Sequence, residues 1–165
     1  MGALAVGSAA PDFTLPKMDG KQFNLKDALA RGPVVLAFFK VSCPVCQFAF
    51  PYVERIYKAH GDSNVSIIGV SQNNDKDTAA FMREYGITFP IALDDTKSYP
   101  ASNAYGLTNV PSLFYVAPDG TIEVSSVGWV RKEMEEINRK ISETAENKPA
   151  QIFQAGEVIP DFRAG

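Results

Sequence analysis

Residues 34–46 read VVLAFFKVSCPVC, a continuous apolar run followed closely by two cysteines. An apolar run without alternation is typical of a central strand covered on both faces, so we expect a buried strand over 34–39. From Pro44 to His60, apolar residues recur at spacings of three and four, which indicates a helix that Gly61 ends. The two cysteines therefore lie where a buried strand meets a helix.

This junction gives the two cysteines different chemistry. With Pro44 as the first helical residue, free backbone N–H groups and the helix dipole point at the sulfur of Cys43 and stabilise its thiolate. Cys46 lies one turn further along and deeper, at a spacing that permits a disulfide. We expect Cys43 to attack a substrate disulfide and Cys46 to resolve the mixed disulfide.

The cysteine count also favours a chemical role for the pair. The chain has only these two cysteines, and a disulfide between them closes almost no loop, so it would add little stability. A structural zinc site needs four ligands, whereas the chain offers two cysteines and one histidine, His60. We therefore expect no metal site and no other cofactor.

The rest of the chain alternates strand-like and helix-like segments, which indicates an α/β sheet with helices on both faces. Outward from the cysteines, we expect a hairpin at 12–25, a helical turn at 27–30, strands at 65–70, 89–93, 113–116 and 121–127, helices at 75–85 and 130–145, and a short helix at 97–105 that Pro100 interrupts. The length and the 45% hydrophobic content predict one domain over 1–146, followed by an irregular tail over 147–165.

One short pattern occurs twice. Residues 156–162 repeat the G-x-x-x-P-D-F pattern of residues 7–13. Similar turn chemistry at two strand entries explains the match, and so would a duplicated docking segment.

Charge and hydropathy restrict the partners. The net charge is −3 with mixed signs along the chain, which gives no reason to expect nucleic acid or an anionic membrane as a partner. No apolar run reaches the roughly 18 residues that a membrane span needs. The first residues lack a basic segment and are not a secretory signal as they stand, so we expect a cytoplasmic protein; a signal peptide removed from the natural chain would instead indicate the periplasm.

Several motifs resemble the thioredoxin superfamily, in the branch of the peroxiredoxins (AhpC/TSA) and the TlpA/ResA-like redoxins. The resemblance covers about Val6 to Ala145. It rests on the PDF segment at 7–13 with its hairpin, the Cys43-Pro44-Val45-Cys46 motif, Pro51 in the following helix, Val110-Pro111 before an apolar strand, and the segment 72–105. It implies a thioredoxin-like fold: a central mixed β-sheet flanked by helices, with an N-terminal hairpin and a helix–strand insertion before a cis-proline.

The same resemblance implies a thiol-disulfide oxidoreductase. Its partners would be protein or small-molecule disulfides as substrates and a thiol as electron donor. Pro111 would be cis and face the cysteine pair, and the backbone of Val110 would pair with an incoming peptide like an added strand. Pro44 and Val45 would also contact the substrate.

The chain also departs from thioredoxin itself. Ser42 stands where thioredoxin has a tryptophan, and Ala37 stands where it has the buried aspartate that moves the Cys46 proton. Lys40 is the nearest titratable residue, and its cation would further favour the Cys43 thiolate if it points inward; otherwise it is a solvated lysine at the strand end. Glu54 is expected on the surface.

Two other functions fit parts of the pattern. In a peroxiredoxin-like thiol peroxidase, Cys43 would be peroxidatic and Cys46 resolving, but Leu36 and Lys40 occupy the positions of the Pro and Thr in the peroxidase motif P-x-x-x-T-x-x-C. A binding module that uses only the fold and its peptide groove is the second alternative. The intact C-x-x-C motif favours the oxidoreductase over both.

Overall fold

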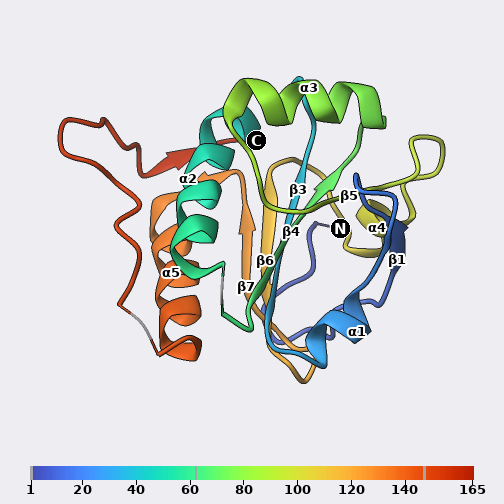
Figure 1. The fold of residues 1–165 in the computed structure, drawn as a ribbon, viewed down its shortest axis with the longest axis horizontal. Helices are drawn as coiled ribbons and strands as arrows, with labels where there is room; N and C mark the ends of the chain where they lie inside the picture. The colour runs from blue at the N-terminus through green and yellow to red at the C-terminus, as the bar shows by residue number, and fades with distance from the viewer. Residues whose placement is uncertain (1, 62, 147) are drawn as a thin grey trace.

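The computed structural model describes residues 2–61, 63–146 and 148–165 and shows a five-stranded sheet with helices on both faces (Figure 1). Met1 and Asn147, where we expected the domain and the tail to begin, lie outside the described residues. The strands are β1 (Thr14–Pro16), β2 (Gln22–Asn24), β3 (Val34–Phe39), β4 (Ser66–Ser71), β5 (Ile91–Leu93), β6 (Ser112–Val116), β7 (Ile122–Val127), β8 (Trp129–Val130) and β9 (Phe162–Arg163). The helices are α1 (Leu25–Leu29), α2 (Pro44–His60), α3 (Asp75–Tyr85), α4 (Pro100–Ala104) and α5 (Arg131–Thr144).

Strand β3 lies at the centre of the sheet order β5-β4-β3-β6-β7, parallel to β4 and antiparallel to β6. All its side chains are buried, and they enter two hydrophobic clusters in alternation. Ala37 belongs to the cluster that includes side chains of α2, α3 and α5, whereas Phe38 belongs to the cluster with α1, α4 and the β1–β2 hairpin. The mixed sheet, its helical layers and the hairpin confirm the predicted thioredoxin-like fold class.

The elements on either side of the cysteines have the predicted bounds, because strand β3 and helix α2 carry strong periodic signals. The short helix α4 differs: Pro100 begins it instead of interrupting a longer helix over 97–105. Proline fits the first turn of a helix, where its missing N–H has no intrahelical partner to lose. The residues before Pro100 consequently form turns.

Glu54 corrects a second expectation, because it is buried at 4% exposure and not on the surface. Its carboxylate accepts hydrogen bonds from the backbone N–H of Thr88 at 2.8 Å, from the Thr88 hydroxyl, and from the N–H of Phe89 at 3.3 Å. A charged side chain is tolerated inside when polar donors satisfy it. Glu54 therefore ties α2 to the segment that leads into β5.

The C-terminal tail runs back along α5 and ends near the start of α2 (Figure 1). We predicted an irregular tail, and most of it has neither helix nor strand, but β9 pairs antiparallel with β8. A two-residue strand has no periodicity to detect, and its partner lies far back in the sequence. The tail also packs on the domain through Ile152, which is buried at 4% exposure.

An ion pair holds the middle of the tail. The Arg55 guanidinium donates two hydrogen bonds of 2.8 Å to the Glu157 carboxylate. These bonds lower the pKa of Glu157 from 4.5 to about 2. The lowered pKa means that the pair contributes fully above about pH 4.5 and is lost only as the pH falls toward 2.

The repeated P-D-F pattern has a structural counterpart. The carbonyl of Pro11 accepts a hydrogen bond from the Tyr105 hydroxyl at 2.8 Å, and the carbonyl of Pro160 accepts one from the indole N–H of Trp129 at 2.7 Å. Both aromatic side chains are buried. Each copy of the pattern thus docks on the domain through its prolyl carbonyl. Among the described helices, none is long and apolar enough to cross a membrane.

The buried carboxylate of Glu54 leads to a stability prediction. Glu54→Ala removes the acceptor of the Thr88 and Phe89 N–H groups and leaves that of the buried Phe89 without a partner, so we expect the free energy of unfolding to fall by about 2 kcal/mol. Urea unfolding of the reduced protein, followed by circular dichroism, measures this change. The matched control is Glu84→Ala on the exposed surface of α3, which should change the free energy by less than about 0.5 kcal/mol. Equal losses in the two variants would show that the Glu54 hydrogen bonds add nothing.

Candidate active site

The start of α2 holds the sulfur of Cys43. Cys43 is the N-cap residue of this helix, and its sulfur accepts a hydrogen bond from the backbone N–H of Cys46 at 3.1 Å. The turn before the helix is closed by the N–H of Cys43, which donates to the carbonyl of Lys40 at 3.3 Å. Cys43 is partly exposed, so its sulfur is open to a reaction partner.

Cys46 lies in a contrasting environment. Its side chain is fully buried in the cluster that contains Ala37. Burial raises the pKa of the Cys46 thiol well above its ordinary value of 9.0, and the hydrogen bond with the Cys43 side chain raises it further. The Cys46 thiol therefore stays protonated at neutral pH while Cys43 is accessible.

The Val110–Pro111 segment, which directly precedes β6, also lies at this site. The peptide bond between these residues is cis, and the Val110 carbonyl oxygen lies 3.4 Å from the Cys43 sulfur. The Ser112 hydroxyl donates to the carbonyl of Asn109 at 2.8 Å and closes this loop just before β6. These contacts confirm the predicted cis-proline and its position beside Cys43.

Two polar side chains that sequence reasoning missed hold the loop before Cys43. The backbone N–H of Val41 donates to the Asn73 side chain at 3.0 Å, and the Gln47 side chain donates to the Val41 carbonyl at 2.9 Å. Gln47 follows the motif directly and could be suspected from its position. Asn73 lies 32 residues from Val41 in the sequence, with no local signal to connect them.

The two residues between the cysteines differ in exposure. Pro44 is exposed next to Cys43, which agrees with the expected substrate contact. We expected Val45 to contact the substrate. Its side chain is instead only 8% exposed and belongs to the core cluster beneath α2, so a substrate cannot reach most of it. The helical turn points Val45 inward, because Pro44 and Val45 differ in direction by about 100° on a helix of 3.6 residues per turn.

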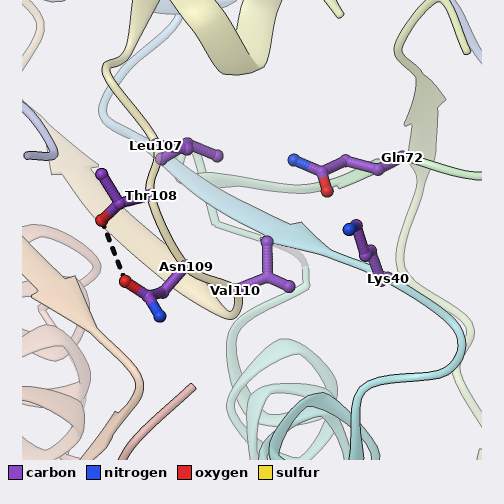
Figure 2. A pocket seen from close by; sticks show the side chains of 6 residues that line it. All are labelled: Lys40, Gln72, Leu107, Thr108, Asn109 and Val110. Atoms are coloured by element: carbon purple, nitrogen blue, oxygen red, sulfur yellow. Dashed lines mark hydrogen bonds between the residues drawn. The ribbon is translucent and has the colours of Figure 1, made fainter.

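Lys40 lies in a pocket beside the site. Its side chain is exposed and lines a pocket of about 180 Å³. Figure 2 shows Lys40 and Gln72 on one side of this pocket, facing the loop of Leu107, Thr108, Asn109 and Val110. Val110 lines the pocket and also contacts Cys43, so the pocket adjoins the reactive sulfur.

The described part of the chain holds no group of three or more His, Cys, Asp or Glu side chains that could bind a metal ion. The site itself presents two thiols in different surroundings: Cys43 at a helix N-terminus with an N–H donor on its sulfur, and Cys46, which burial keeps protonated.

Comparisons with known proteins agree with this geometry. The AhpC/TSA family model matches residues 6–125. The thiol-disulfide oxidoreductase ResA of Geobacillus thermodenitrificans is 33% identical over 132 residues, which cover 79% of this chain and 74% of that protein. ResA of Bacillus subtilis is 31% identical over 133 residues, covering 80% and 73%.

Solved structures show the same fold. The thioredoxin domain of a thiol-disulfide oxidoreductase from Bacteroides vulgatus superposes with a TM-score of 0.74 at 24% identity, covering 84% of this chain and 98% of that chain. A thiol:disulfide interchange protein from Chlorobium tepidum superposes with a TM-score of 0.69 at 22% identity, covering 87% and 99%. The motif, the fold and the relatives agree: this chain belongs to the AhpC/TSA family, in its branch of ResA-like thiol-disulfide oxidoreductases with a thioredoxin fold.

Proposed function

We propose that this protein reduces disulfides in proteins and small molecules, with Cys43 as the attacking thiolate and Cys46 as the resolving thiol, and that a thiol donor restores the dithiol. The contrast between the two sulfurs supports these roles most directly. Cys43 is accessible and receives an N–H donor, whereas Cys46 is buried and kept protonated. The Val110 backbone and Pro111 form the surface beside which the substrate reacts.

The reaction proceeds in two exchanges. The Cys43 thiolate attacks one sulfur of the substrate disulfide, the substrate S–S bond breaks, and the released thiolate takes up a proton from solvent. Cys46 then gives its proton to solvent and attacks the Cys43 sulfur of the mixed disulfide. The S–S bond between Cys43 and the substrate breaks, and the second substrate thiolate leaves and takes up a proton from solvent. The substrate has gained two electrons, and the Cys43–Cys46 pair has lost them to form a disulfide.

The two contacts of Cys43 favour the reductive direction. A dithiol protein becomes a strong oxidant when its reduced form is specially stabilised. Here the Cys43 sulfur has one N–H donor, from Cys46, and the Val110 carbonyl oxygen 3.4 Å away can only accept a hydrogen bond, so these contacts give the reduced form no special stabilisation. Cys46 gains no charged stabilisation because it stays protonated. The Cys43–Cys46 dithiol therefore favours giving its electrons to a substrate disulfide.

The peroxidase alternative receives no comparable support. The residues at the Pro and Thr positions of the peroxidase motif are Leu36, which is buried in β3, and Lys40, which is exposed in the neighbouring pocket. Neither places a hydroxyl group beside the sulfur of Cys43. We therefore assign disulfide exchange as the activity of this site.

The proposed direction predicts the redox potential. Equilibration of the protein with mixtures of reduced and oxidised glutathione, followed by quantification of free thiols, should give a potential more negative than about −200 mV. A value near −120 mV, which is typical of strong oxidants, would reverse the proposed direction.

The two sulfur environments predict different labelling. Limiting iodoacetamide at pH 7 should modify Cys43 in at least about tenfold excess over Cys46, because the raised pKa of Cys46 leaves little thiolate and burial blocks access. Mass spectrometry of peptides identifies the adduct. Cys46→Ser should accumulate a mixed disulfide with a peptide substrate, whereas Cys43→Ser should not. Preferred labelling of Cys46 would contradict the assignment.

For Lys40 we propose a role in attracting substrates, because its exposed side chain faces the pocket that adjoins Val110. Lys40→Met should slow exchange with oxidised glutathione, which is anionic, about two- to fivefold at low salt. Its rate with neutral iodoacetamide should stay within about twofold of the parent. Salt near 0.5 M should remove the difference, because it screens exposed charges. A large fall in the iodoacetamide rate would instead indicate that Lys40 activates the thiol directly.

A further inference from the structure

The last residues of the tail lie against the active site. The Asn109 side chain donates to the carbonyl of Gly165 at 3.0 Å. Gly165 approaches Val110 so closely that a Cβ atom at this position would collide with the Val110 carbonyl group. The tail therefore touches the residue whose carbonyl lies 3.4 Å from the Cys43 sulfur.

Defined contacts hold this part of the tail, residues 160–165, which we call the strap. Strand β9 within it pairs with β8 in the register Trp129↔Arg163 and Val130↔Phe162. The N–H of Arg131 donates to the carbonyl of Asp161 at 2.9 Å, in addition to the bond between Trp129 and Pro160.

Gly128 and the Phe48 ring also contact the strap. A Cβ atom on Gly128 would collide with the Arg163 carbonyl and lie 3.1 Å from the backbone nitrogen of Gly165, so the strap uses the space left by this glycine. The Arg163 guanidinium lies over the Phe48 ring, 5.1 Å from its centroid. Phe48 is two residues beyond Cys46, so the strap reaches from α2 to the Val110 loop.

A polypeptide substrate needs the same space. Its disulfide must approach the Cys43 sulfur, and the chain on either side of that disulfide must then pass close to Val110, because Val110 contacts the sulfur. Gly165 already occupies the surface of Val110. A small disulfide extends only a few atoms from the reacting sulfurs and requires less of this surface.

We propose that the strap is an intramolecular competitor of polypeptide substrates, which must displace it from Val110 before their disulfides reach Cys43. The proposal rests on the proposed role of Cys43 as the attacking thiolate. The strap is suited to release because its strand pairing involves only two residues on each side and its Phe162 side chain is 60% exposed. A competitor that occupies the site most of the time lowers the apparent affinity for substrate by the fraction of open molecules.

The substitution Gly165→Val tests this competition in the full chain, because its side chain would collide with the Val110 carbonyl and dislodge the end of the strap. Arg163→Ala is a second variant that removes the contact with Phe48. Val158→Ser is the matched control, because Val158 is in the tail but outside the strap and is 90% exposed. None of these positions belongs to the cysteine machinery.

The readout compares a large and a small disulfide. With reduced protein in single-turnover reactions, the rate with insulin should rise about three- to tenfold in both strap variants, and the rate with 2-hydroxyethyl disulfide should change by less than about twofold. The control should match the parent with both substrates. Unchanged or slower insulin reduction in both strap variants would overturn the competition.

A labelling experiment separates this inference from the proposed function. Cys43 should react faster with a maleimide that carries a polyethylene glycol chain in the strap variants than in the parent, while labelling by iodoacetamide stays constant. This result requires only that the strap shields Cys43 from bulky reagents, so it stands even if the parent reduces neither disulfide. Equal labelling of parent and variants by the polymer reagent would show that the strap does not obstruct Cys43.

Discussion

The position of Cys43 depends on the complete burial of strand β3. This strand has hydrogen-bonded neighbours on both edges and hydrophobic clusters on both faces, so its end cannot shift without disturbing the whole sheet. Only four residues separate the end of this strand from the start of helix α2, so the first N–H groups of the helix point from a fixed position. The antiparallel partner β6 begins directly after Pro111, which brings the Val110 carbonyl to the same end of the sheet. One buried strand thus places both halves of the active site.

The parts of this arrangement that the sequence predicts are those with a local cause. The apolar run of β3, the periodicity of α2 and the proline after Cys43 each act within a few residues, so the strand, the helix and the positions of the two cysteines could be derived from pattern and spacing. The pairing of Val110-Pro111 with Cys43 has no local cause and was predicted only through resemblance to a family. The structure confirms both kinds of prediction for the geometry.

Three features differ from expectation or add to it, and their physical reasons are not the same. Glu54 was placed on the surface because charged residues usually are, but donors from a segment 34 residues away satisfy it inside the protein. Val45 was assigned to the substrate surface although the helical turn directs it into the core. The described part of the tail is mostly irregular, as expected, and its pairing with β8 involves only two residues and so has no periodic signal in the sequence. The burial of Glu54 and the pairing of the tail depend on tertiary partners that the sequence does not identify, whereas the direction of Val45 follows from the local helical geometry.

Trp129 makes the position of the strap measurable by fluorescence. It is the only tryptophan of the chain, and its buried indole lies within 5.0 Å of Phe48 and 5.2 Å of Tyr52, measured between ring centroids. Its N–H is bonded to Pro160 at the beginning of the strap. When the strap leaves, this indole loses its hydrogen-bond acceptor and meets water. The protein therefore carries its single tryptophan against the first residue of the strap, and the emission wavelength of this tryptophan reports opening without any label.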